Sequence, residues 1–133
     1  MITDNNGSYF DPNGLLIESG TTVRFVNSSG SHSTTAYHPD NDDTPLRIPE
    51  DATAWDSGVY TNAEETFEHT FDVEGVYDYY CTPHAMLGMV GRIVVGTPQD
   101  GPGTEPPADL PPAAKESLPS IDTILEKEVV KGP

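Results

Sequence analysis

The sequence contains 133 residues, about one domain, and its 22 acidic and 6 basic residues give a formal charge of −16 at pH 7. Nucleic acids and anionic membranes bind proteins through lysine and arginine, so this charge argues against both as partners. No apolar run approaches the roughly 18 to 20 residues that cross a bilayer. The single cysteine excludes an internal disulfide and any site that needs two thiolates.

Residues 1–97 carry the alternation of polar and apolar residues that predicts β-strands. Turn signals rich in Gly, Pro, Asn and Ser separate the candidates, for example at Phe10–Gly14 and Asn27–Gly30. The expected strands span residues 15–17, 22–26, 33–37, 66–73, 76–80 and 91–95. Such short, regularly spaced strands predict an all-β sandwich or barrel, with no long helix before residue 97. The acidic segment 39–62 is expected to be an irregular excursion between strands.

The composition changes near residue 97. All eleven aromatic residues lie before this point, all three lysines lie after it, and residues 98–133 contain eight prolines. The composition therefore predicts a domain over 1–97 and a flexible, Pro-rich acidic tail over 98–133. Within the tail, Ser120 is a candidate cap for a short helix at 120–130. The tail is expected to be weakly structured, and docking of this helix on this or another domain is the alternative.

Most charged residues of the domain are acidic. Residues 1–97 hold 15 acidic residues, three arginines and no lysine. Self-repulsion of this size destabilises a compact fold, but at molar salt the Debye length falls to about 3 Å and screens it. The acidic residues are spread along the whole domain, which favours adaptation to high salt, a halophilic property. An acidic docking face for a basic partner is the alternative.

One segment combines three side chains that bind soft metal ions. Residues 80–89 read Tyr-Cys-Thr-Pro-His-Ala-Met-Leu-Gly-Met and place Cys81, His84 and Met89 in one loop between two predicted strands. Sulfur ligands together with imidazole suit copper, and two histidines, one cysteine and a weak axial methionine form the arrangement of blue-copper electron transfer. The loop supplies three of these four ligands. The remaining histidine has to come from elsewhere, and His32, which follows strand 22–26 and its turn, is the best candidate.

Two sequence patterns together resemble a known family. The first is Val23-x-Phe25-x-Asn27-x-x-Gly30-x-His32, and the second is Gly75-x-Tyr77-x-Tyr79-Tyr80-Cys81-x-Pro83-His84-x-x-x-x-Met89. Over residues 9–95 the chain is similar to the cupredoxins, and among them most of all to plastocyanins, pseudoazurins and the halocyanins of salt-loving archaea.

The resemblance implies a Greek-key β-sandwich that holds one type 1 copper ion, with His32, Cys81, His84 and Met89 as ligands. It also decides between the two loop methionines: Met89 matches the axial position, so Met86 is expected at the surface near the site. In plastocyanins and azurins an asparagine follows the upstream histidine and braces the ligand loop. Here Ser33 stands at that position. Hydrogen bonds to ligands tune the metal, so the reduction potential of the family does not carry over.

Two histidines lie outside this set. His69 lies on the inward face of its predicted strand and is expected to be a core residue, with a metal role as the alternative. His38 precedes Pro39 and is expected at the surface, with an adventitious metal site among Asp40, Asp42 or Asp43 as the alternative.

These residues predict a one-electron carrier and not an enzyme. In the family, the second loop histidine reaches the surface inside an apolar patch, which implies an electron exit at His84 surrounded by Pro83, Met86 and Leu87. The expected partners are redox proteins, with a cytochrome or a membrane respiratory complex as candidates. A copper storage or delivery module would use the same ligands. An enzyme with Cys81 as nucleophile and His84 as base is a second alternative, but it leaves His32 and Met89 unexplained.

Cupredoxins work outside the cytoplasm, so the resemblance implies an extracytoplasmic location. The start of the sequence, Met1-Ile2-Thr3-Asp4, lacks the basic and apolar pattern of a signal peptide, so any export signal is expected to have been removed or never present. The tail would connect the domain to a membrane anchor or a partner domain outside this sequence.

Overall fold

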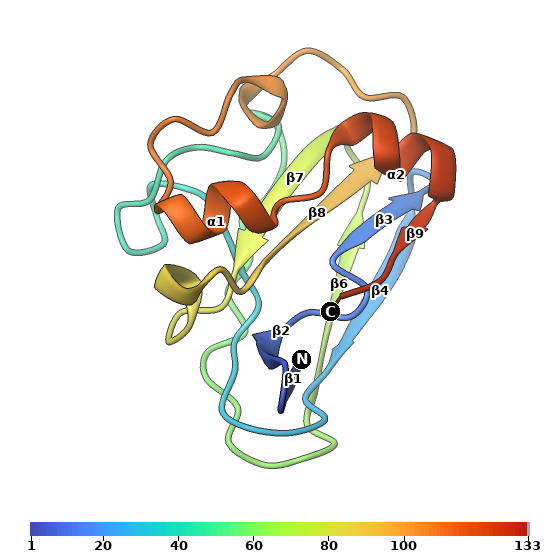
Figure 1. The fold of residues 1–133 in the computed structure, drawn as a ribbon. Coiled ribbons are helices and arrows are strands. Elements are labelled where there is room, and N and C mark those ends of the chain that lie inside the picture. Colours follow the sequence, from blue (N-terminus) through green and yellow to red (C-terminus); the bar gives the residue numbers. More distant parts are fainter. Residues whose placement is uncertain (133) are drawn as a thin grey trace.

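Two β-layers enclose one aromatic core in the computed structural model, which describes residues 1–132 (Figure 1). The larger layer is a five-stranded sheet with the order β5-β7-β8-β3-β9. Its strands are β5 (Thr35–Ala36), β7 (Gly75–Tyr80), β8 (Val90–Val95), β3 (Gly14–Ile17) and β9 (Val129–Val130). The second layer pairs β4 (Thr21–Val26) with β6 (Thr66–Phe71), and a hairpin of β1 (Ile2–Asp4) and β2 (Gly7–Tyr9) lies beside the lower end of β4 (Figure 1). The predicted β-sandwich is confirmed.

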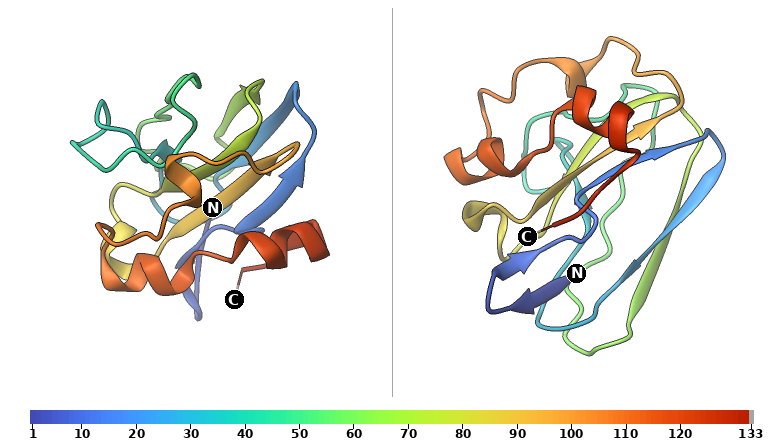
Figure 2. Two further views of the ribbon diagram at one scale, coloured as in Figure 1. Left: turned by 90° about the horizontal axis from the view of Figure 1, so that it is seen from above. Right: turned by 45° about the vertical axis from the view of Figure 1, so that its right-hand side comes forward.

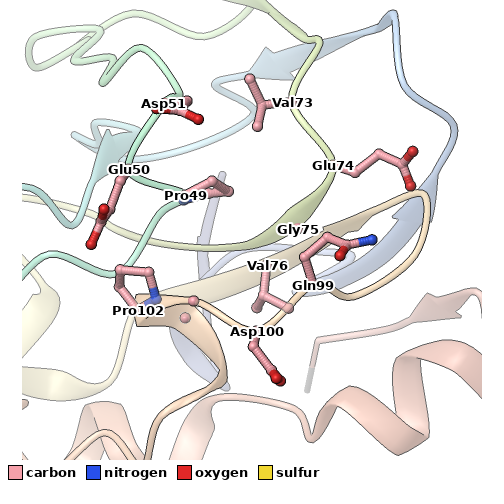
Figure 3. A pocket seen from close by; sticks show the side chains of 12 residues that line it. Pro49, Glu50, Asp51, Val73, Glu74, Gly75, Val76, Gln99, Asp100 and Pro102 are labelled. Carbon is pink, nitrogen blue, oxygen red and sulfur yellow. The ribbon is translucent and has the colours of Figure 1, made fainter.

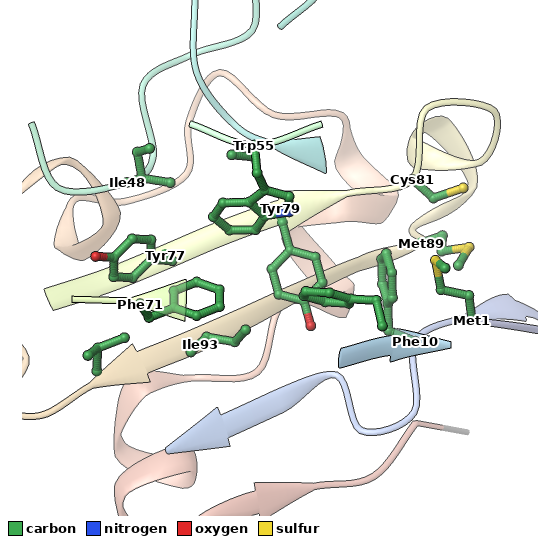
Figure 4. Packing of buried hydrophobic residues seen from close by; sticks show 13 residues of the cluster. Met1, Phe10, Ile48, Trp55, Phe71, Tyr77, Tyr79, Cys81, Met89 and Ile93 are labelled. Carbon is green, nitrogen blue, oxygen red and sulfur yellow. The ribbon is translucent and has the colours of Figure 1, made fainter. Parts of the chain in front are cut away.

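Alternation along the strands produces the core between the layers. Phe25 of β4 lies edge-on to Tyr79 of β7 at 5.5 Å between ring centroids, and Phe71 of β6 lies edge-on to Tyr77 of β7 at 5.1 Å. Such edge-to-face pairs contribute beyond the apolar area that they bury. Figure 4 shows Tyr77, Phe71 and Tyr79 following one another through the core, with Cys81 at one end of it. The core therefore continues directly to the cysteine of the predicted metal site.

The segment 39–62 forms no named strand in the described structure, as its composition predicts, but it does not stay at the surface. Its Trp55 is 4% exposed, packs between the two layers and donates a hydrogen bond from Nε1 to Thr34 Oγ1 at 3.1 Å. Ile48 is fully buried in the same cluster. The excursion therefore closes one side of the sandwich.

Residues 98–132 pack against the outer face of the five-stranded sheet, whereas their composition predicts a flexible linker (Figure 2). They form a short 3₁₀ turn η2 (Pro102–Thr104), the helices α1 (Pro112–Ser117) and α2 (Ile121–Lys127), and β9. Ser120 caps α2 by accepting a hydrogen bond from the Thr123 amide, within the predicted helix. None of the helices within residues 1–132 has the length and apolar character needed to span a bilayer. Pro133, the last residue of the predicted tail, lies outside the described residues.

Apolar contacts with the sheet offset the entropy of ordering this segment. Ile124 of α2 is fully buried against Val76 and Val94, which point away from the aromatic core. Leu110 and Ala114 pack in a second cluster on the same side. The segment packs with few apolar residues of its own, because the sheet supplies the other half of each contact. A count of its own residues cannot show this.

A buried charge cluster also holds the C-terminal segment in place. Asp78 in β7 is fully buried and accepts hydrogen bonds from Arg92 Nε at 2.7 Å and from Arg47 Nε at 3.0 Å. Both arginines then donate to main-chain carbonyls of the segment: Arg92 to Pro119, and Arg47 to three carbonyls at 102–105. Two of the three arginines of the domain therefore face inward, and the charge of Asp78 neutralises only part of theirs.

Candidate metal centre

Three predicted ligands meet at one end of the core. Cys81 Sγ lies 3.7 Å from His32 Nδ1 and 3.5 Å from His84 Nδ1. Within residues 1–132 these three form the one group of His, Cys, Asp or Glu donors close enough to share a metal ion, with all ligand atoms within 4.8 Å of one another. His32 and Cys81 are 49 residues apart in the chain, so the fold and not the local sequence brings them together.

Backbone hydrogen bonds close the loop that carries Cys81, His84 and Met89. The Cys81 amide donates to the Met89 carbonyl at 3.0 Å, and the Met89 amide donates to the His84 carbonyl at 3.1 Å. Between them lies the single turn η1 (Ala85–Leu87), which ends at Gly88 in the left-handed conformation with φ of 92°. The loop therefore forms a closed turn, with Met89 fully buried at the same end of the core as Cys81 (Figure 4).

His32 is fixed by the segments on either side of it. Its main chain exchanges two hydrogen bonds with Tyr60, and the side chain of the buried Asn27 donates to the Gly30 and Asn62 carbonyls. The ring is fully buried, and this burial lowers the pKa of His32. A lowered pKa favours the neutral imidazole, which is the form that binds metals.

The environment of Cys81 suits a ligand and not a free nucleophile. Its side chain is fully buried, and burial raises the pKa of the Cys81 thiol. The Ser33 amide donates to Sγ at 3.4 Å and opposes that rise. A thiol with a raised pKa becomes a thiolate when a metal ion displaces its proton.

Ser33 also links the upstream segment to the ligand loop, although it is not the asparagine of the family pattern. Its hydroxyl oxygen accepts a hydrogen bond from the Thr82 amide at 2.8 Å and donates to Thr82 Oγ1 at 3.0 Å. Thr35 Oγ1, at 2.9 Å from Ser33 Oγ, donates to Asp56 Oδ1 at 3.0 Å and extends this network. A serine and two threonines therefore connect the same two segments that a longer amide side chain would bridge.

The donor set and its spacing fit copper. In a tetrahedral or trigonal site, bonds of about 2.0 Å to nitrogen and 2.3 Å to sulfur, as seen for zinc, place the two ligand atoms about 3.5 to 3.8 Å apart. The sulfur–nitrogen distances of 3.5 and 3.7 Å lie in this range. One thiolate and two imidazoles, with a buried thioether nearby, are the donors that copper takes in electron-transfer sites.

Residues 1–96 match the family model for copper-binding proteins of the plastocyanin/azurin family. The chain belongs to the plastocyanin/azurin family. It is 40% identical over 93 residues to the chloroplastic plastocyanin of Chlamydomonas reinhardtii, covering 69% of this chain and 61% of that protein. It is 36% identical over 93 residues to halocyanin of Natronomonas pharaonis, covering 68% and 50%. It therefore spans only half to three fifths of the length of these two relatives.

Solved structures of cupredoxins confirm the fold. A pseudoazurin from Sinorhizobium meliltoi aligns with a TM-score of 0.66 at 27% identity, covering 86% of this chain and 83% of that one. A purple cupredoxin from Nitrosopumilus maritimus aligns with a TM-score of 0.52 at 30% identity, covering 70% and 86%. The expected resemblance to cupredoxins is confirmed, and copper is the cofactor of this family.

The residues predicted to surround the electron exit lie in the ligand loop, residues 81–89. Pro83 is exposed, Met86 is 73% exposed and Leu87 is 75% exposed, while the half-buried His84 lies between them and the buried cysteine.

The two other histidines lie away from the ligand loop. His69 stacks on Trp55 with ring centroids 4.7 Å apart, and burial lowers the pKa of His69. His38 Nδ1 accepts a hydrogen bond from the Asp40 amide and lies 3.6 Å from the Asp40 carboxylate. Neither histidine belongs to a group of three donors in the described part of the chain.

Sequence reasoning missed two residues next to the cluster. Thr82 accepts and donates hydrogen bonds with Ser33, and Thr3 lies 3.0 Å from the His32 ring. Thr82 is recognisable only by its place in the ligand loop. Thr3 gives no sequence signal because its contact depends on a hairpin 29 residues away from His32.

A pocket of about 390 Å³ lies away from this centre, between the β6–β7 turn and the start of the C-terminal segment (Figure 3). Its wall carries the carboxylates Glu50, Asp51, Glu74 and Asp100, and none of its lining residues is a histidine or a cysteine. Its described lining therefore lacks the sulfur and imidazole donors that suit copper.

Proposed function

We propose that this chain is a one-electron carrier that holds a single type 1 copper ion with His32, Cys81, His84 and Met89. The observation that carries the proposal is the convergence of two imidazole nitrogens on one buried sulfur, in a chain of the copper-binding plastocyanin/azurin family. Bound copper would alternate between Cu(I) and Cu(II) and so accept and release one electron. Residues 1–97 would form the copper domain, and residues 98–133 its C-terminal segment.

The chain contributes a rigid and dry environment for these ligands. Cys81, His32 and Met89 are fully buried, and the loop and its neighbours are joined by hydrogen bonds through Ser33 and Thr82. Donors that are already in place move little when the charge of the ion changes, and small reorganisation favours fast electron transfer. This rigidity supports the carrier over a storage or delivery module, which has to release its ion.

Exposed apolar residues beside His84 supply a docking surface. Met86 and Leu87 are each more than 70% exposed, and Pro83 lies next to them. A small apolar patch suits the brief, small interfaces of redox encounters. We propose that redox proteins, such as a cytochrome or a membrane respiratory complex, dock here and exchange electrons through the His84 ring.

The same geometry opposes the enzyme alternative. A catalytic cysteine is partly exposed and has a lowered pKa, whereas Cys81 is fully buried and burial raises its pKa. The relatives described above are a plastocyanin, a halocyanin, a pseudoazurin and a purple cupredoxin. We further propose that the protein works outside the cytoplasm, as the family resemblance implies, and that its acidic surface is adapted to high salt. The C-terminal segment would connect the domain to a membrane anchor or a partner domain.

Replacing Cys81 with serine tests the copper assignment. The copper-loaded protein is expected to show the intense visible absorption of a Cu(II)–thiolate bond, bleached by ascorbate, and Cys81→Ser is expected to lose it completely. Ser19→Ala, which removes a hydroxyl from the exposed turn before β4, serves as a control with an unchanged spectrum. A Cys81→Ser protein that keeps the same spectrum would contradict the assignment, and slow electron exchange with cytochromes in the coloured native protein would favour storage.

The docking surface is tested by adding charge to it. Leu87→Asp is expected to slow electron exchange with a redox partner about tenfold or more, because a desolvated carboxylate weakens an apolar contact, while the visible spectrum stays unchanged. Val129→Asp adds the same charge at a position that is 49% exposed on β9, far along the sheet, and controls for net charge. Equal rates in both variants would place docking elsewhere.

A further inference from the structure

The far side of the His32 ring contacts a residue from the N-terminal hairpin. While His32 Nδ1 faces Cys81, Thr3 Oγ1 in β1 lies 3.0 Å from His32 Nε2. The His32 side chain is fully buried, whereas Thr3 itself is exposed on the side away from the ring. Each nitrogen of the ring thus has a defined neighbour, one on the metal side and one on the hairpin side.

The contact has a direction that follows from metal binding. If Nδ1 is to offer its lone pair, the ring proton has to be on Nε2, and a buried N–H group needs an acceptor. Thr3 Oγ1 fits this role, because its own hydroxyl proton has a second partner in Ser8 Oγ at 2.9 Å. Ser8 faces Thr3 directly in the β1–β2 pair. With the ring proton on Nε2, the hydrogen bonds can run in one consistent order, from His32 to Thr3 to Ser8.

The hairpin is tied to the loop before His32, which fixes the position of Thr3. The Thr3 amide donates to Ser29 Oγ at 2.9 Å, and Ser29 Oγ donates back to the Thr3 carbonyl at 2.9 Å. Gly30 leaves room for the contact: its φ is +84°, and a Cβ there would collide with Thr3 Oγ1 and lie 2.9 Å from His32 Nε2. Any side chain at position 30 would thus separate Thr3 from the ring.

We infer that Thr3 is a positioning residue for the copper site: it accepts the Nε2 proton of His32 and so fixes the tautomer and the ring plane that present Nδ1 to the metal. Outer partners of ligating histidines commonly act in this way. The inference rests on the proposed copper-binding function. The Ser29 carbonyl also interacts with the ring and is the competing acceptor.

Ring-nitrogen NMR of the copper-free and Cu(I)-loaded proteins tests the inference at one fixed pH. The native protein is expected to show His32 as the Nε2–H tautomer with a slowly exchanging ring proton. Thr3→Val, which removes the hydroxyl at nearly constant shape, is expected to lose that slow signal and to weaken Cu(I) binding about 10-fold or more. Thr3→Ser is expected to restore both. Thr22→Val removes a hydroxyl from the exposed Thr22–Thr70 pair and is expected to change neither.

Two results would overturn the inference. If Thr3→Val keeps the slow Nε2–H signal, the Ser29 carbonyl is the acceptor and Thr3 is dispensable. An Nδ1–H tautomer of His32 in the native protein would also overturn it, because that tautomer excludes the proposed order of bonds and is read without any variant. The copper-free measurement does not depend on electron transfer, so failure of the carrier function would appear separately, in the visible spectrum of the Cys81→Ser comparison.

Discussion

Replacing Asp78 with asparagine is expected to lower the free energy of unfolding by about 3 to 5 kcal/mol, the largest effect that we expect from a single polar substitution in this protein. The carboxylate is fully buried and lies 2.7 Å from Arg92 and 2.9 Å from Arg47. Without its charge the two buried guanidinium groups repel each other, and asparagine offers them one acceptor oxygen where the carboxylate offers two. The measurement is urea unfolding followed by the fluorescence of Trp55.

The exposed ion pair on the opposite layer provides the control. Arg24 and Glu68 lie 3.3 Å apart with side chains 64% and 55% exposed, so Glu68→Gln is expected to change stability by less than about 1 kcal/mol. Raising the salt concentration is expected to erase the small effect and to leave most of the large one, because buried pairs are poorly screened. Similar losses in the two variants would show that the Asp78 cluster is not structurally special.

Shortening the Ile124 side chain to alanine is the second change from which we expect a large loss of stability. Ile124 is fully buried between α2 and the sheet, so Ile124→Ala is expected to lower the free energy of unfolding by about 2 to 5 kcal/mol. Its neighbour Leu125 is 40% exposed, and Leu125→Ala is expected to lose clearly less. Urea unfolding of both variants, side by side, measures how firmly the C-terminal segment is docked.

The pair of variants separates a docked segment from a loose one. If the segment were only weakly attached, the two alanine variants would unfold at the same urea concentration as the native protein. A docked segment instead gives a single cooperative transition that shifts with Ile124→Ala, because the segment and the sheet unfold together.

The ligand loop and most strands were predictable from the sequence because their signals are local. Alternation fixes the inward faces of β4 and β6, and the spacing of Cys81, His84 and Met89 is short enough to define one loop. His32 was reachable as well, since a single turn separates it from a strong strand.

Docking of the C-terminal segment, which the sequence offers only as an alternative for its helix, and the proposed role of Thr3 both depend on contacts with distant parts of the chain. The segment is stabilised by Arg47 and Arg92, whose guanidinium groups supply the donors for its carbonyls. Its apolar partners, such as Val76, belong to strands whose sequence does not distinguish them from other core strands. The composition of a segment gives its own residues, but not the surface against which the segment packs.

The pairing of β9 with β3 has a consequence for biosynthesis. The Val130 carbonyl accepts from the Asn13 amide and the Glu128 carbonyl from the Leu16 amide, so residues near 130 complete an edge that begins at residue 13. On the ribosome, β3 emerges long before this partner and presents an unprotected edge to other nascent chains. Chains truncated before α2 would keep that edge open and are expected to aggregate, so synthesis of residues 128–130 is the step that protects the sheet.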